Sequence, residues 1–304
     1  MKSDSPAGLR RKIGSAADLQ SVVRAMKAQA AASVGQYQRS VAALGDYARS
    51  VELGLSVCFR EVAAHAETEP AQPRKAGGEI RAIVFGSDQG LVGRFNDIVV
   101  DFARTSLAQL PAPASVWAVG ERVNASLRDS DLPLLGVFPV PGSVGAIAAL
   151  VSDILVTVVR EFREVDTPAT STQLHLYYNR PGSGAGYAPV GQRLLPLDDA
   201  WQQGLARQPW PTGMLPETLG KPTTTLRALI REYLFVSIFR ACAESLASEN
   251  ASRLAAMDRA DHNIDAMLGT LNDNLHRLRQ AQIDEELSDV ISGFKALSDA
   301  SRAA

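Results

Sequence analysis

The sequence has little cysteine, few aromatic residues and no excess of charge of either sign. Two cysteines in 304 residues, Cys58 and Cys242, cannot form a disulfide framework, and they are typical of a reducing cytoplasm. Aromatic residues make up 6%, so the core must depend on alanine and medium aliphatic residues, as in close helix packing. The 31 basic and 33 acidic residues give a net charge of −2, which argues against a nucleic-acid-coating protein.

Long hydrophobic runs are also missing. No window reaches the roughly 18 consecutive apolar residues that a membrane-spanning helix needs, so we expect no direct membrane insertion. Residues 1–20 lack the apolar core of a signal peptide, so we expect no secretory leader at this end.

Proline is absent from two long windows. Of the 16 prolines, 15 lie between Pro70 and Pro222, which leaves residues 7–69 and 223–304 without any. Proline breaks helix interiors, because it lacks a backbone donor and its ring clashes with the preceding turn. The distribution predicts a long helix, a mixed domain and a second long helix.

The first window has a heptad-like apolar repeat. Fifteen positions from Leu9 to Cys58 alternate steps of four and three residues, and 13 of them are apolar; the exceptions are Gln20 and Lys27. At 1.5 Å per residue this seam would extend roughly 75 Å. Several glycines weaken the helix, so it needs a partner helix rather than its own propensity.

The second window supplies that partner. Its apolar stripe has three parts, with one slip of five residues before the last: Leu226, Leu229, Tyr233 and Val236; Ile264, Leu268, Leu271, Leu275 and Leu278; Ile283, Leu287, Val290, Phe294 and Leu297. The polar stretch 245–262 predicts either a stutter or an exposed section. Residues 1–60 have a net charge of +5 and residues 222–304 one of −3, which favours antiparallel pairing of the two helices.

The middle of the chain alternates short strands and helices. Expected strands are 80–85, 115–119, 134–140, 172–178 and 192–197, and expected helices are 95–109, 121–128 and 144–162. Such alternation implies a largely parallel sheet with helices on its faces. The fold class is therefore α/β, a long antiparallel coiled coil with an inserted Rossmann-like domain. The expected division is 1–66, 78–221 and 222–304, with a linker from Glu67 to Gly78.

A glycine-rich loop follows the first expected strand, where backbone N–H groups can bind phosphate. It lacks the Gly-Lys-Ser/Thr ending of a Walker loop, since no lysine lies between Lys75 and Lys221. The spacing of Gly86, Gly90 and Gly93 also misses the dinucleotide-binding pattern. We therefore expect these glycines to serve a tight turn and a close contact between helix and strand.

No other pattern indicates catalysis. The four histidines are scattered without a second ligand at metal-binding spacing, and both cysteines have apolar helical neighbours. The acidic pairs Asp198–Asp199 and Glu285–Glu286 are adjacent residues, which point to different faces of a helix. The sequence predicts no enzyme, no metal and no cofactor.

Three motifs, in order along the whole chain, resemble the gamma subunit of rotary F-type ATP synthases. Val22–Ala31 resembles the family's N-terminal helix, with a basic residue, Ala-Met and an alanine-rich run. Ser87–Asn96 is similar to the family's Ser-Asp-Arg/Gln-Gly-Leu-Cys-Gly-x-x-Asn loop. Residues 248–263 and 277–293 resemble its C-terminal signature. Departures at Val92, Arg94–Phe95 and Asp284 suggest a divergent or alternative form, such as one from a second synthase operon or a sodium-translocating variant.

The resemblance implies a central-stalk rotor that transmits torque between a membrane ion-translocating ring and a catalytic hexamer. The implied partners are alpha and beta subunits, an epsilon subunit and the membrane c-ring, with no nucleic acid, at the cytoplasmic face of the inner or plasma membrane. The residues implied to contact partners are Arg24, Met26, Lys27, Arg279, Gln280 and Asp284. The residues implied to form the structural loop are Ser87, Asp88, Gly90, Gly93 and Asn96.

Two other function classes remain open at this stage. A coiled-coil scaffold would share both helices but gives no reason for the loop Ser87–Asn96. A nucleotide-binding α/β enzyme would need a base to anchor phosphate, and titration with ATP would reveal it. Co-purification with alpha, beta and ring subunits belongs to the rotor alone.

Overall fold

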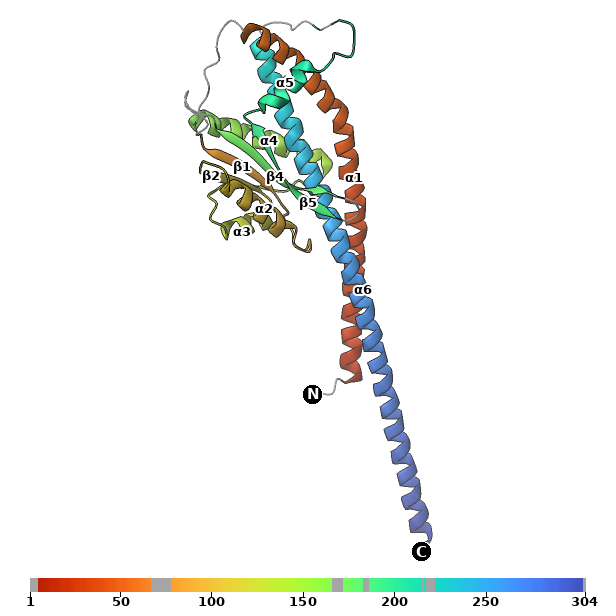
Figure 1. Cartoon of the computed structure of the whole chain (residues 1–304). Coiled ribbons are helices and arrows are strands. Elements are labelled where there is room, and N and C mark those ends of the chain that lie inside the picture. Colours follow the sequence, from red (N-terminus) through yellow and green to blue (C-terminus); the bar gives the residue numbers. More distant parts are fainter. Residues whose placement is uncertain are drawn as a thin grey trace. The chain divides into compact units, whose positions relative to one another are not determined.

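The computed structural model describes residues 5–66, 78–165, 172–182, 186–214, 216 and 222–302 (Figure 1). Side chains are described for all of these except 62–66, 163–165, 222 and 294–302. The predicted linker 67–78 lies almost wholly outside the described residues. Two units are distinguished: Met1–Gln29 with Leu254–Ala304 form unit 1, and Ala30–Arg253 form unit 2.

Two long helices contribute to both units. Helix α1 covers Pro6–Ala66 and helix α6 covers Pro222–Arg302. Within unit 1 the side chain of Gln20 contacts Asp265 while that of Lys27 contacts Asp258, so the helices run antiparallel there. All fifteen seam positions of α1 are buried or half-buried, including Gln20 and Lys27. The predicted antiparallel pairing is confirmed within each unit.

Unit 2 contains a five-stranded sheet in the order β3-β2-β1-β4-β5. The strands are β1 Ile80–Phe85, β2 Ala114–Val119, β3 Leu134–Phe138, β4 Gln173–Pro181 and β5 Tyr187–Leu195. The first four are parallel, and β5 runs antiparallel beside β4. The predicted α/β fold class is confirmed.

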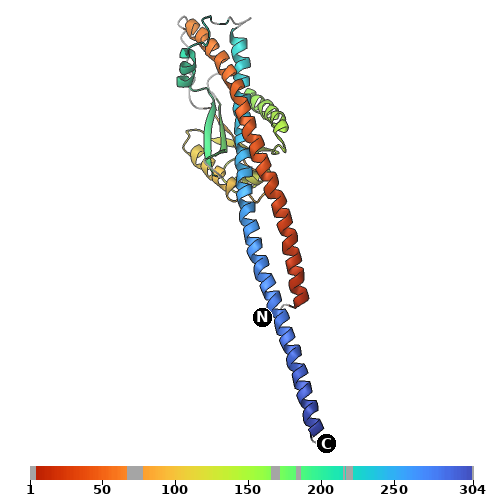
Figure 2. The same cartoon turned by 90° about the vertical axis from the view of Figure 1, so that its right-hand side faces the viewer.

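The two faces of the sheet are covered by different helices (Figures 1 and 2). Helices α2 Phe95–Ala108 and α3 Glu121–Arg128 cover one face, against Ile80, Ala82 and Val84 of β1. Helix α4 Val144–Val165 and the unit 2 parts of α1 and α6 cover the other, against Ile83 and Phe85. Strand β1 alternates between two apolar cores, as a fully buried strand must.

The structure corrects one expectation about α6. The stretch 245–262 was predicted to be a stutter or an exposed section, but Ser245, Ser248 and Glu249 are 3%, 0% and 5% exposed. Small polar side chains allow close approach to the sheet, and the Ser248 hydroxyl donates to the Asn179 carbonyl of β4 at 2.9 Å. The exposed alternative is therefore wrong for this part.

Helix α5 Asp199–Arg207 is not among the elements expected from the sequence. Its N-terminus is capped by the Asp198 carboxylate, which accepts a hydrogen bond from the Trp201 amide at 2.8 Å. Trp201 packs edge-on against Phe59 of α1, so α5 closes a small apolar cluster of unit 2.

The last part of the predicted α6 stripe finds no cover among the described residues. Ile283, Leu287 and Val290 are 50%, 54% and 70% exposed. The side chains of Phe294 and Leu297 lie outside the described set. No helix within the described ranges is long and apolar enough to cross a membrane.

Candidate functional site

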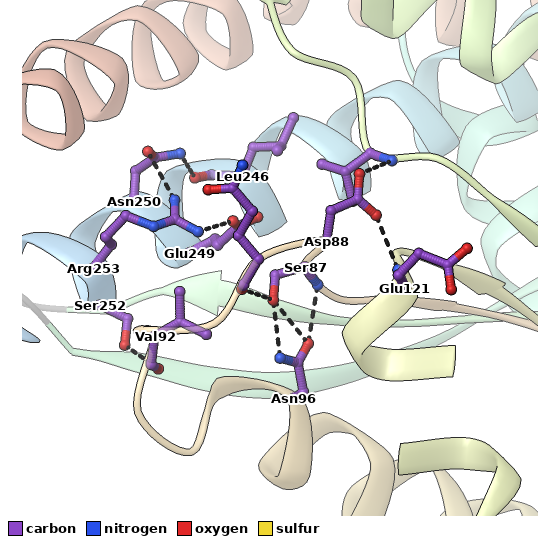
Figure 3. A network of polar contacts seen from close by, with 12 residues as sticks. Ser87, Asp88, Val92, Asn96, Glu121, Leu246, Glu249, Asn250, Ser252 and Arg253 are labelled. Atoms are coloured by element: carbon purple, nitrogen blue, oxygen red, sulfur yellow. Dashed lines mark hydrogen bonds and ion pairs between the residues drawn. The ribbon is translucent and has the colours of Figure 1, made fainter. Parts of the chain in front are cut away.

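The loop after β1 is held by a buried Ser–Asn pair. The Asn96 Oδ1 atom accepts a hydrogen bond from the Ser87 amide at 2.9 Å, and its Nδ2 donates to Ser87 Oγ at 2.9 Å (Figure 3). The Ser87 hydroxyl in turn donates to the Gln89 carbonyl at 2.9 Å. These hydrogen bonds tie the loop to the first turn of α2.

Asp88 joins this loop to two neighbouring strand ends. Its Oδ1 accepts from the amide of Glu121, just after β2, at 2.9 Å, and its Oδ2 accepts from the amide of Val140, just after β3, at 3.0 Å. The carboxyl ends of three parallel strands therefore meet at one carboxylate. Charge-assisted bonds of this kind are roughly twice as strong as neutral ones.

Glycines allow the close approach of these segments. A Cβ on Gly120, whose φ is +117°, would lie 2.7 Å from the Ser87 carbonyl oxygen. A Cβ on Gly86 would overlap Val123. Gly93 has a φ of +59° and Leu91 one of +64°, a conformation that costs energy for leucine. Gly90 faces the Arg122 guanidinium and has no positive φ.

The same loop contacts helix α6. The Ser252 hydroxyl donates to the Val92 carbonyl at 2.7 Å. Asn179 of β4 donates to the Phe95 carbonyl at 2.9 Å, and Ser248 donates to the Asn179 carbonyl at 2.9 Å. We call the loop 86–96 together with residues 246–253 the loop junction.

A buried ion pair lies within the loop junction. Arg253 Nη2 is 2.6 Å from Glu249 Oε1, and the side chains are 12% and 6% exposed. Burial raises the pKa of Glu249, and the Arg253 guanidinium offsets part of this effect. Glu249 Oε2 and Arg253 Nε have no hydrogen-bond partner among the described residues.

A second polar cluster lies in unit 1. Arg24 Nε is 3.0 Å from Asp261 Oδ1, Lys27 Nζ is 2.5 Å from Asp258 Oδ1, and the Gln20 amide donates to Asp261 at 3.0 Å. We call the six residues that form this cluster the helix clasp: Gln20, Arg24, Lys27, Asp258, Asp261 and Asp265. The hydrogen bond between Lys27 and Asp258 raises the pKa of the lysine and lowers that of the aspartate.

The clasp surrounds a small apolar core. Met26 is half-buried and packs against the cluster formed by Ala16, Val23, Met257 and Ile264. It therefore contributes to the helix pair, and its predicted role at a partner subunit stays a prediction.

The other predicted contact residues lie further along α6. Arg279, Gln280 and Asp284 are exposed. Gln280 Nε2 donates to Asp284 Oδ1 at 3.3 Å, one helical turn on. Arg279 makes no ion pair among the described residues, so its guanidinium is available to a partner. The six predicted contact residues thus fall into two groups that the structure does not bring together.

The sequence analysis missed the aspartates of the clasp and the α6 partners of the loop. A signal for the clasp exists: Gln20, Arg24 and Lys27 are spaced by four and three residues. Asp258, Asp261 and Asp265 are spaced by three and four, as facing rows of an antiparallel pair require. Within the described part of the chain, no group of three or more His, Cys, Asp or Glu side chains could hold a metal ion.

The family model described as ATP synthase matches residues 5–297. The chain belongs to the ATP synthase family. Curated relatives include the ATP synthase gamma chain of Moorella thermoacetica, 29% identical over 95% of this chain and 98% of the relative. The gamma chain of Pelotomaculum thermopropionicum is 28% identical, again over 95% and 98%. As a gamma-type member of the ATP synthase family, the chain is a non-catalytic subunit.

Solved structures of ATP synthase share the fold. The rotor of Euglena gracilis mitochondrial ATP synthase has a TM-score of 0.56 at 15% identity, over 91% of this chain and 98% of that one. The central stalk and c-ring structure of Tetrahymena thermophila mitochondrial ATP synthase gives 0.52 at 22% identity, over 79% and 99%.

Proposed function

We propose that the chain is the central-stalk rotor subunit of an F-type ATP synthase and transmits torque between an ion-translocating membrane ring and a catalytic hexamer. The observation that carries this proposal is the family match over residues 5–297, in a chain whose curated relatives are gamma chains along nearly their whole length. The paired long helices and the inserted sheet domain are the parts that such a rotor needs.

Torque requires a surface that differs around its axis. A rotor biases each catalytic subunit among its states only through contacts that differ between those states. In unit 1, the clasp gives charge to one side of the helix pair, and the exposed Arg279 extends this charged face further along α6. We propose that Arg279, Gln280 and Asp284 contact beta subunits through such a face.

Arg24 and Lys27 have a double role in this proposal. Both are bound to aspartates of α6, yet their side chains remain 57% and 34% exposed. Exposed ion pairs contribute little free energy, so these cations can share their hydrogen bonds with a carboxylate of a passing subunit. Met26 lies between them on α1.

The implied partners are alpha, beta, epsilon and c-ring subunits, and the implied place is the cytoplasmic face of the membrane as a peripheral protein. The comparison structures include a rotor and a central stalk with its c-ring, which supports this set. The division of the chain at 66, 78 and 221 also remains a proposal.

Nucleotide binding at the glycine-rich loop is disfavoured by its geometry. The amides at the ends of β2 and β3 donate to the Asp88 carboxylate rather than remaining open to a phosphate. A carboxylate at this position repels a polyphosphate.

The test is reconstitution of the full chain with alpha and beta subunits from the same organism. We expect ATP-driven rotation of a bead attached through a cysteine introduced at Ala125, an exposed residue of α3. A complex that hydrolyses ATP without rotation, or a chain that never enters the complex, contradicts the proposal.

Single substitutions test the contact residues in the same complex. Met26→Lys is expected to assemble but to couple hydrolysis poorly to ion movement. If Arg279 clamps a partly desolvated carboxylate, Arg279→Ala removes a bond worth about 1.5–3 kcal/mol, and ATPase activity falls accordingly. Gln280→Ala and Asp284→Thr report on the neighbouring contacts. Exposed Arg277→Ala is the matched control, and equal effects at 277 and 279 would refute the specific contact.

A further inference from the structure

An apolar groove lies between α4 and the first turns of α6, within unit 2. Its volume is about 810 Å³. The floor is aliphatic and includes Leu155, Ile230 and Leu234. A further 440 Å³ hollow shares Leu155 and Arg231 with it, so the depression continues along both helices.

Three arginines rim this groove: Arg160, Arg227 and Arg231. All three are exposed, and none has an ion pair among the described residues. Val156 and Val159, on the α4 side, are 62% and 44% exposed. Apolar surface rimmed by unpaired charges of one sign is typical of a binding groove rather than of ordinary solvated surface.

The complementary surface is present on the same polypeptide. Residues 280–293 of α6 carry four carboxylates and no basic residue. The apolar side chains Ile283, Leu287, Val290 and Ile291 follow helical spacing and are 50–70% exposed. Asp284 and Glu286 flank this stripe on its two sides. We call residues 280–293 the acidic tail.

We propose that, before assembly, the acidic tail of one copy binds in the arginine-rimmed groove of a second copy. A groove between two helices can bind a third, amphipathic helix. The apolar stripe of the tail would pack on the aliphatic floor, and the carboxylates of the tail would pair with the three guanidinium groups. The interface is a few helical turns long and hence small, so we expect weak association, with a Kd on the order of micromolar or higher.

The inference goes beyond the rotor function. Within the proposed rotor, the catalytic hexamer would bind the acidic tail. Assembly and self-association would therefore compete for the same residues. Self-association then covers two apolar surfaces of the free chain that are otherwise open to aggregation.

Sedimentation velocity of the purified full chain from 1 to 100 µM tests this at 50 and 500 mM NaCl. We expect concentration-dependent species larger than a monomer that weaken at high salt. The groove variant Arg160→Glu/Arg227→Glu/Arg231→Glu should weaken association at least tenfold, as should the tail variant Asp284→Lys/Glu286→Lys. Because these positions are exposed, circular dichroism should be unchanged. Exposed Arg128→Glu on α3, on the opposite face of the sheet, is the control and should associate like the parent.

Mixing the groove variant with the tail variant should restore association between them, since the reversed charges then match. A strictly monomeric parent would overturn the proposal. So would association that ignores both variants. Assembly with alpha and beta subunits is measured separately on the groove variant, which leaves the tail intact, so a failed rotor function and a failed self-association give different results.

Discussion

The loop junction of unit 2 and the helix clasp of unit 1 both place charged side chains of α6 in polar contacts, but in different surroundings. In the junction, Ser87, Ser248 and Glu249 are at most 5% exposed. In the clasp, the side chains of Arg24 and Asp265 are 57% and 59% exposed. The same residue types therefore have different consequences: the buried set fixes one arrangement, whereas the exposed set can exchange partners with water or protein at little cost.

The largest effect is expected from breaking the buried pair. Glu249→Ala leaves the Arg253 guanidinium buried without a counter-charge, which typically costs about 3–5 kcal/mol. Urea denaturation should show this loss of unfolding free energy. Asp46→Ala removes an exposed ion pair with Arg49 and serves as control. Equal stability of the two variants would mean that the junction is solvated like the surface.

A smaller loss is expected at Asp88. Asp88→Ala leaves the amides of Glu121 and Val140 without their acceptor, and the unmet partner groups cost about 1–3 kcal/mol. Asp88→Asn retains an acceptor and should recover part of the loss. Asp101→Ala, at an exposed position of α2, is the matched control. Thermal melts of the parent and the three variants give the order of their stabilities. If Asp88→Ala were as stable as the parent, the carboxylate would not contribute to holding the strand ends at the loop.

The pH dependence of unit 2 gives a third test. Burial, with a smaller effect of Arg193, lowers the pKa of His175 to about 4. The unfolded chain, with an ordinary pKa near 6.5, therefore binds the proton first as pH falls. The free energy of unfolding should decrease between about pH 6.5 and pH 4. His175→Gln should remove this part of the slope, and an identical slope in the variant would show that other groups cause it.

The smallest effect is expected in the clasp. Lys27→Met removes the ion pair to Asp258 and keeps the aliphatic contact, so unit 1 should lose little stability at 150 mM salt. The difference from the parent should grow at low salt, since screening weakens. Amide hydrogen exchange of residues 16–29 reports on this unit directly. A large loss of stability that does not depend on salt would mean that the clasp, like the loop junction, behaves as a buried polar cluster.

Much of the fold could be predicted, because its signals are local. The absence of proline from two windows predicted both long helices. Strand β1 and helix α3 have the expected bounds. Polar Ser248 misled the prediction for α6, because periodicity does not show that a small polar group can be satisfied in a core.

The site could be predicted only in part. The family resemblance predicts a structural loop at Ser87, Asp88 and Asn96. All three side chains make hydrogen bonds within the loop or to a neighbouring strand end, and the assignment itself stays a prediction. The α6 residue that binds the loop, Ser252, lies 160 residues from its partner Val92, and no local pattern pairs such distant positions. The contact roles of Arg24, Met26, Lys27, Arg279, Gln280 and Asp284 depend on other subunits and stay predictions.

The clasp also affects how the chain folds. Gln20 and Asp261 are 241 residues apart, and all of unit 2 lies in the sequence between them. During synthesis the first helix therefore leaves the ribosome long before its partner exists, with its apolar seam uncovered. Closing so long a loop is slow unless the intervening sheet folds first and shortens the effective distance. The inserted domain would then act as a folding nucleus that brings the two ends of the polypeptide within reach of each other.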